Sequence, residues 1–234
     1  MPVHIHPTAA LAPRALLPGD PGRALALAQL LLDEPKMFNH NRGLWGYTGT
    51  AADGESMTIQ STGMGGPSTA IVMEELCDLG LRRAIRVGTC GALAAGLGLG
   101  DLVIADAALA GDGTSRALGA ADRVAADAGL VAALSAGAGG GVRRGLIVTS
   151  DLFYDRDDSR SAGWAATGAL AIEMEAAALL RVAELRGVQA ACVLLVTDVF
   201  DDDGERRRLD PDALVLAAQR LGEVGAAALI AVSA

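Results

Sequence analysis

Short apolar runs alternate with segments of helical periodicity along the whole chain, and glycine- or proline-rich turns separate them. Apolar runs of this length predict buried strands, whereas apolar positions that recur every three or four residues predict helices. The predicted strands are residues 47–51, 56–61, 82–88, 101–109, 142–154 and, as the last of them, 189–200. The predicted helices are residues 23–34, 63–80 after a glycine loop, 122–136, 173–187 and 211–232. This alternation predicts an α/β domain in which helices cover a largely parallel or mixed sheet.

Unusual residues gather in the loops that follow the predicted strands, namely "PGDPGR", "GMGG", "RVGTCGA", "SDLFY" and "TDVFDD". In open α/β sheets, ligands bind at the carboxyl ends of the strands. These loops are therefore where we expect a site. Since no linker or internal repeat divides the sequence, residues 1–234 are predicted to form one domain.

The composition limits the partners of such a site. A formal charge of −9 argues against nucleic acid or an anionic membrane as the main partner, so an anionic ligand needs local positive charge. Lys36 is the only lysine among nineteen basic residues, which excludes a Walker-type phosphate lysine. Compositional bias of the genome can explain that preference for arginine, yet any phosphate recognition must still use guanidinium groups.

The cysteines and the amino terminus indicate where the protein works. Cys77, Cys90 and Cys192 have neither paired nor metal-like spacing, so we expect no disulfide and no zinc site. Prolines and Arg14 interrupt the first residues, which do not read as a signal peptide, and no apolar run is expected to reach the roughly 20 residues of a membrane span. We expect a soluble, cytoplasmic protein.

Two of the loops suit a small oxyanion. In "LPGDPGR" and "RVGTCGA", Gly19 allows close approach of a backbone N–H, Arg23 and Arg86 supply guanidinium groups, and Thr89 adds a hydroxyl. The alternative is an ordinary strand-to-helix turn with Arg23 opening the helix. The "GMGG" loop has serine at the third glycine position of a dinucleotide motif and arginines where an acidic residue belongs, which disfavours a NAD-type site.

Carboxylates mark two other loops. Glu173 and Glu175 either favour the start of a helix electrostatically or accept hydrogen bonds from a vicinal diol, with Met174 and Met64 beneath a sugar. Asp198 ends an apolar strand. A carboxyl group in apolar surroundings tends toward a raised pKa and can donate a proton near neutral pH; the alternative is that Asp198 only caps its loop.

Together these motifs resemble the nucleoside phosphorylase family that includes hexameric purine nucleoside phosphorylases and uridine phosphorylases. The resemblance spans roughly residues 4–200 and is carried by "LPGDPGRA", "NRGLWGYTGT", "TGMGGPSTAI", "RVGTCGAL", "SDLFY", "AIEMEAAA" and "TD". It implies a single domain with a central mixed twisted sheet flanked by helices. It also implies phosphorolysis of nucleosides with inorganic phosphate as co-substrate, no metal or organic cofactor, and a homo-oligomer arranged as a trimer of dimers.

The resemblance implies a role for each matching residue. Those implied for phosphate are Gly19, Arg23, Arg86 and Thr89, with Arg42 lent by a neighbouring subunit. Those implied for ribose are Met64, Glu173, Met174 and Glu175, with His4 lent by the neighbour in preference to His6. Those implied for the base are Phe153, Tyr154, Ile172 and Thr197. Asp198 is implied to protonate the leaving purine.

Two departures from the family pattern affect the substrate. Asp157 and Ser159 stand where uridine phosphorylases carry Gln and Arg, and Asp198 has no counterpart in them, so both features favour a purine. The family's catalytic arginine has three candidates, Arg206, Arg207 and Arg208, of which Arg208 is favoured; a solvated charge run is the alternative. The remaining alternatives are a uridine phosphorylase, a nucleosidase that uses water, and a nucleoside-binding protein without activity.

Overall fold

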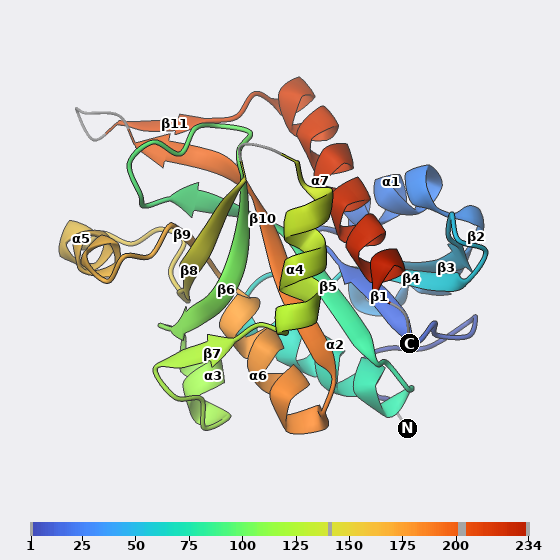
Figure 1. The fold of residues 1–234 in the computed structure, drawn as a ribbon. Coiled ribbons are helices and arrows are strands. Elements are labelled where there is room, and N and C mark those ends of the chain that lie inside the picture. Colours follow the sequence, from blue (N-terminus) through green and yellow to red (C-terminus); the bar gives the residue numbers. More distant parts are fainter. Residues whose placement is uncertain (1, 140–141, 201–204, 233–234) are drawn as a thin grey trace.

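The computed structural model describes residues 2–139, 142–200 and 205–232 (Figure 1). Its strands are β1 (Arg14–Leu17), β2 (Asp33–Asn39), β3 (Gly46–Thr50), β4 (Ser56–Gln60), β5 (Arg83–Ala92), β6 (Leu102–Ala110), β7 (Arg123–Ala125), β8 (Arg143–Thr149), β9 (Ala171–Glu173), β10 (Gln189–Phe200) and β11 (Arg206–Arg208). Its helices are α1 (Pro21–Leu31), α2 (Gly66–Asp78), α3 (Gly113–Ala117), α4 (Ala128–Gly137), α5 (Asp158–Ala166), α6 (Ala176–Arg186) and α7 (Pro211–Ala231), with a short 3₁₀ turn η1 at Asn41–Gly43.

The strands form one mixed sheet whose central part closes on itself. Its order is β11-β10-β6-β8-β9-β5-β1-β4-β3-β2, and β10 pairs with β5 as well as with β6. The strands β5, β10, β6, β8 and β9 therefore make a closed ring, while β1, β4, β3 and β2 extend from it. The predicted mixed sheet flanked by helices is confirmed. The closure was not predicted, because β9, which completes it, contributes only three residues.

Helices cover both faces of the sheet, and the side chains of β10 show why that strand is apolar throughout. Its residues 190, 192, 194 and 196 lie in the core cluster that α2 and α6 complete. The alternate residues 191, 193 and 195 lie in the cluster that α1, α4 and α7 complete. Successive strand residues point to opposite faces, so a strand buried on both sides reads as a continuous apolar run. In Figure 1, α4 and α7 lie together on one side of the sheet.

Most predicted elements are present, and the differences have local causes. The hairpin of β3 and β4, the α2 helix ending before Gly80, the 189–200 strand and the closing helix capped by Asp210 are confirmed. The prediction of a helix over 122–136 is wrong at its start, because Arg123–Ala125 forms β7 and Asp127 caps α4 through Leu130 N. The strand predicted over 142–154 ends at Thr149. Residues 189–200 are not the last strand, since β11 follows.

The expectation that no apolar run is long enough for a membrane span is wrong for α7 by length and composition alone. It is the one such helix in the part of the chain that the structure describes. Its residues Leu221, Val224 and Leu229 are buried in the core cluster that α7 shares with the sheet. Buried core helices of globular domains pass the same test, so this helix is read as part of the fold.

Candidate active site

A cavity of about 520 Å³ lies where the loops after β1, β4 and β5 meet the end of β10. Because β1 is parallel to β4 and to β5, and β5 is parallel to β10, the carboxyl ends of these strands lie at one edge of the sheet. The predicted residues that line the cavity are Gly19, Arg23, Met64, Arg86, Thr89, Phe153, Ile172, Glu173, Met174, Glu175, Thr197, Asp198 and Arg208. Three predicted residues, His4, Arg42 and Tyr154, do not line it.

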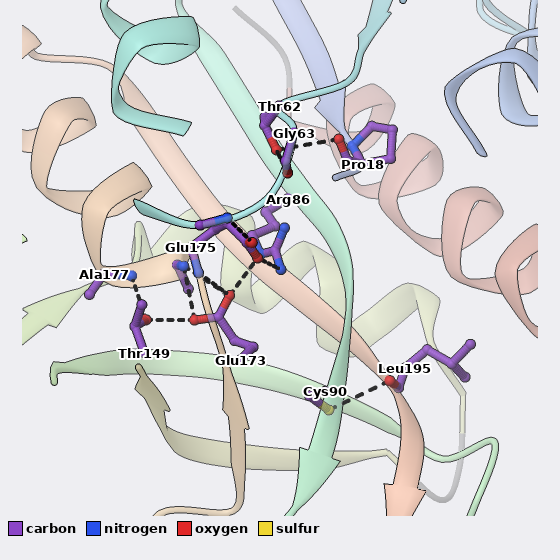
Figure 2. Close-up of polar contacts among 12 residues, drawn as sticks. Pro18, Thr62, Gly63, Arg86, Cys90, Thr149, Glu173, Glu175, Ala177 and Leu195 are labelled. Atoms are coloured by element: carbon purple, nitrogen blue, oxygen red, sulfur yellow. Dashed lines mark hydrogen bonds and ion pairs between the residues drawn. The ribbon is translucent and has the colours of Figure 1, made fainter. Parts of the chain in front are cut away.

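The first wall of the cavity is built from two loops that bind one another. Thr62 N donates to Pro18 O at 2.9 Å and Gly63 N donates to Gly19 O at 3.0 Å, as Figure 2 shows for Thr62 and Pro18. Asp20 caps α1 by accepting from Arg23 N at 2.6 Å, which fixes the start of the helix and the backbone of Arg23. The two prolines and two glycines of "LPGDPGR" thus place an arginine at the cavity.

Arg86 reaches this wall from β5 and is held by two carboxylates (Figure 2). Its Nε donates to Glu173 Oε2 at 3.0 Å, and its Nη2 makes a short contact with Glu175 Oε2. Burial lowers the pKa of Arg86, but the charges of Glu175 and Glu173 raise it overall. Burial and the nearby charge of Arg86 lower the pKa of Arg23, against an opposing effect of Asp20. A buried guanidinium group, that of Arg86, and a partly buried one, that of Arg23, therefore both line the cavity.

Glu173 is the most enclosed member of this cluster. Burial raises its pKa, and the guanidinium of Arg86 opposes that rise. Thr149, at the end of β8, donates its hydroxyl to Glu173 Oε1 at 2.5 Å and accepts from Ala177 N at 2.8 Å. The sequence analysis missed Thr149, because a threonine at a strand end has no signal of its own; only its place before "SDLFY" pointed to this loop.

Glycines shape the cluster through their backbone. Gly65 has φ +84°, a left-handed conformation that favours glycine, and its N–H donates to Glu175 Oε1 at 2.6 Å. The "GMGG" loop therefore serves as a donor to a carboxylate of the site. Its glycines were noted in the sequence, but this donor role was not predicted.

The opposite end of the cavity is built around Asp198. A register shift in the β10–β5 pairing lies between Val196 and Asp198, and it places Asp198 opposite Gly91. Bulges of this kind redirect a side chain. Thr197 Oγ1 donates to Asp198 Oδ2 at 2.8 Å, which links the two predicted residues directly.

Asp198 pairs with two arginines of β11. Arg206 Nε lies 2.8 Å and Arg208 Nε 2.9 Å from Asp198 Oδ1. The prediction of apolar surroundings is wrong for these carboxylate oxygens, which contact guanidinium groups and a hydroxyl. Alternation along β11 directs Arg206 and Arg208 to one face, and both line the cavity, whereas Arg207 does not. The side chain of Arg206 is 31% exposed and that of Arg208 is 63% exposed, so Arg206 is the more enclosed of the two.

Aromatic side chains surround this second end, although aromatic residues are only 3% of the chain. Phe153, Trp164 and Phe200 line the cavity, and the guanidinium carbon of Arg206 lies 4.5 Å from the centre of the Phe153 ring. Such a wall offers flat apolar faces for a planar ring. Phe153 was predicted to contact a base, whereas Trp164 and Phe200 were missed because single aromatic residues are usually core filling.

The comparison with known families agrees with this geometry. The sequence model of the phosphorylase superfamily matches residues 13–231, which is nearly the whole chain. The chain belongs to the phosphorylase superfamily.

Relatives of this superfamily member include purine nucleoside phosphorylases and a uridine phosphorylase. A DeoD-type purine nucleoside phosphorylase of Clostridium beijerinckii is 38% identical over 208 residues, covering 86% of this chain and 87% of its own. Another of Oceanobacillus iheyensis is 41% identical over 196 residues, covering 80% and 83%. Among solved structures, uridine phosphorylase from Vibrio fischeri ES114 superposes with a TM-score of 0.87 at 27% identity and covers 99% of both chains.

Three predicted site residues, His4, Arg42 and Tyr154, do not line the cavity and lie at the surface of the chain. His4 is held by Glu75, whose Oε1 is 2.8 Å from His4 Nδ1, and His4 O accepts from Asn41 Nδ2 at 2.9 Å. Arg42, next in sequence to Asn41, is exposed and has φ +56°, a left-handed conformation uncommon for a residue with a side chain. His4 and Arg42 therefore belong to one surface region. Tyr154 is 84% exposed and packs edge-to-face on Phe153.

Within residues 2–139, 142–200 and 205–232, no group of three or more His, Cys, Asp or Glu side chains is arranged to hold a metal ion.

Proposed function

We propose that this chain catalyses the phosphorolysis of purine nucleosides, in which a nucleoside and inorganic phosphate give a free base and a pentose 1-phosphate. The proposal depends most on the spacing along the paired strands β5 and β10. A Cβ on Gly88 would touch the Arg86 guanidinium, and Gly91, three residues later, pairs with Asp198. At about 3.3 Å per strand residue, the backbones of Gly88 and Gly91 are roughly 10 Å apart, and we infer that one nucleoside spans between an anion at Arg86 and the acid at Asp198.

Each end of the cavity has a part in the reaction. Arg23, Arg86, Thr89 and the Gly19 backbone orient phosphate, and Glu175 accepts hydrogen bonds from the sugar diol. Phosphate attacks C1′ as the bond to the base breaks through an oxocarbenium-like state. Asp198, protonated on its carboxyl group, delivers that proton to the departing purine, and Arg206 and Arg208 then stabilise the carboxylate that remains. Of these arginines, Arg208 is the one we assign to catalysis, in keeping with the sequence interpretation.

The alternatives are weighed on particular residues. Relatives named purine nucleoside phosphorylases and an acidic residue at position 198 favour a purine over a pyrimidine substrate. A hydrolytic nucleosidase has no need for Arg23 and Arg86 side by side at one end of the cavity. A binding protein without activity has no need for Asp198. Because the fold is similar to that of a uridine phosphorylase, phosphorolysis of uridine is the second candidate activity.

We also propose that the active site is shared between subunits of a homo-oligomer, a trimer of dimers, acting in the cytoplasm. His4 accepts a hydrogen bond from Asn41, the neighbour of Arg42 in sequence, and neither His4 nor Arg42 lines the cavity, as expected for residues that complete a neighbouring copy's site. Inorganic phosphate is the only co-substrate in this proposal.

The test is phosphate dependence. Purified enzyme is incubated with inosine, adenosine and uridine, with and without phosphate, and released base is measured. Base release from the purine nucleosides should require phosphate and exceed that from uridine. Equal release without phosphate contradicts phosphorolysis and supports the hydrolase, whereas preference for uridine supports the second candidate.

A further inference from the structure

Glu173 and Glu175 are two residues apart, but their carboxylates have different surroundings. Glu173 Oε1 accepts from Thr149 Oγ1 at 2.5 Å and from Ala176 N at 2.9 Å. Its Oε2 accepts from Arg86 Nε at 3.0 Å and from Glu175 N at 2.8 Å. A carboxylate has about four acceptor positions, and these protein donors fill them. Its side chain has 0% exposure, and with these positions filled a ligand hydroxyl finds no acceptor position there.

Glu175 keeps the capacity that Glu173 lacks. Its Oε1 accepts from Gly65 N at 2.6 Å, and its Oε2 contacts Arg86 Nη2. Each oxygen thus accepts one hydrogen bond from the described residues and retains a second acceptor position. The side chain is 9% exposed and lines the cavity, so its remaining positions can meet a diol.

Glu173 contacts the guanidinium group of Arg86 and so affects which of its N–H groups is available to a ligand. Glu173 binds Nε and Glu175 binds Nη2, while the buried Nη1 has no hydrogen-bond partner among the described residues. A buried guanidinium N–H without a partner is costly, and an anion oxygen would satisfy it. We propose that Glu173 is a positioning residue, which holds the Arg86 guanidinium so that Nη1 is offered to phosphate, and that it does not bind the ribose. This rests on the proposed function in taking the anion to be phosphate.

The test separates the phosphate end from the sugar end. In Glu173→Gln the neutral amide weakens the grip on Arg86, so the KM for phosphate should rise about 10- to 100-fold, the range of one charge-assisted hydrogen bond. The preference for a ribonucleoside over its 2′-deoxy analogue, measured as a ratio of kcat/KM values, should stay at the wild-type value. Glu175→Gln is the matched control, and it should lose that preference because it removes the diol acceptor.

The opposite pattern overturns the proposal. If Glu173→Gln loses the ribose preference as Glu175→Gln does and keeps the wild-type KM for phosphate, Glu173 binds the sugar. Should Glu173→Gln fail to fold, Thr149→Val gives the same comparison, since it removes the hydroxyl that holds Glu173. It should raise the KM for phosphate, whereas Thr149→Ser should not, and an unchanged KM in Thr149→Val counts against the proposal.

A binding measurement keeps this inference apart from the proposed function. Inorganic phosphate should raise the melting temperature of the wild-type protein and should raise that of Glu173→Gln much less, whether or not any nucleoside is turned over. If the wild type binds phosphate but releases no base, the proposed function fails and the positioning role stands. An equal phosphate-induced shift in both proteins shows that Glu173 does not position the anion site.

Discussion

The guanidinium of Arg86 lies over Gly88, two residues further along the same face of β5. A Cβ built on Gly88 would lie 2.5 Å from Arg86 Nη2 and 2.6 Å from Arg86 Cζ. Glu173 and Glu175 hold that guanidinium in place, so it cannot move aside without losing both contacts. The absence of a side chain at Gly88 therefore leaves room for a neighbouring side chain.

Gly88→Ala should therefore damage the anion site. The added methyl displaces the Arg86 guanidinium, and misplacement of a substrate-orienting group by about 1 Å can cost about 100-fold in rate. We expect kcat/KM for phosphate to fall by that order in a steady-state assay. Gly137→Ala is the matched control, because its added Cβ has nothing within 4 Å, and it should keep wild-type kinetics.

Asp198→Asn should lower turnover of natural purine nucleosides by about 10²- to 10⁴-fold, the usual contribution of a positioned general acid. The amide cannot deliver the proton, while its shape keeps the contacts with Thr197 and β11. A nucleoside whose purine is already cationic, such as a 7-methylated one, leaves without protonation and should lose much less. Equal losses on both substrates indicate that Asp198 acts by holding Arg206 and Arg208 in position.

Most of the residues predicted from the sequence line one cavity, because they lie in loops after strands, and their roles stay predictions. The sequence could not show which carboxylate oxygens already accept hydrogen bonds from other protein groups. Glu173 and Glu175 are alike in sequence, yet one is enclosed by protein donors and the other faces the cavity. Trp164 lines the cavity and Thr149 binds Glu173, although both lie far along the chain from Arg86, and only the folded sheet brings them there.

At the scale of elements, strong apolar patterns were sufficient to predict strands from the sequence. Short polar strands could not be predicted in this way. The pattern predicted β10 over its full length because both faces of that strand are buried. It did not predict β11, whose three consecutive arginines have no apolar alternation. In the structure Arg208 pairs with Asp198 along the ladder, and their side chains form an ion pair. The partner of β11 is thus a contact between residues apart in the sequence, which the local pattern does not reveal.

The amino-terminal segment is attached to α2 through a single carboxylate. Glu75 accepts from the backbone N–H groups of Val3, His4 and Ile5 and from the His4 ring. Burial alone raises the pKa of Glu75, but these hydrogen bonds lower it to about 2. A lowered pKa means that the ionised form stabilises the folded attachment. That stabilisation is complete above the ordinary pKa of about 4.5 and is lost as pH falls toward 2.

Hydrogen exchange at the Val3, His4 and Ile5 amides should accordingly be slow at pH 5 and accelerate, relative to other protected amides, as the pH falls below about 4.5. Glu75→Gln should show the fast, loosened behaviour already at pH 5. Glu74→Gln removes the same charge one residue away, where the carboxylate contacts Arg186, and should leave these amides protected. Protection that survives in Glu75→Gln shows that other contacts hold the segment.

At the scale of the whole molecule, a site shared between subunits predicts that two inactive variants restore activity when their subunits mix. Arg23→Ala and Arg42→Ala should each be nearly inactive alone. In a two-fold dimer of the two variants, one site collects both changes and the other collects neither. Mixed dimers should therefore recover about half of the wild-type activity by this symmetry.

The exchange experiment has a direct control. Native mass spectrometry establishes that the subunits have mixed, and self-mixed samples of each variant give the baseline. If mixing is complete and activity stays at that baseline, Arg42 acts within its own chain and the shared site is wrong. Recovery of activity after mixing Arg23→Ala with Arg86→Ala is not expected, because both residues line the cavity of one chain.

The closed ring of β5, β10, β6, β8 and β9 also bears on how the enzyme can change over generations. Arg86 and Asp198 lie on two directly paired strands of that ring. The pairing of the strands therefore fixes the distance between these two residues, and with it the length of substrate that fits between them. Inserting a residue into either strand would shift its side chains to the other face. We therefore expect substitutions in the cavity walls, such as those of α5, to change substrate preference with less effect on this spacing than insertions in β5 or β10.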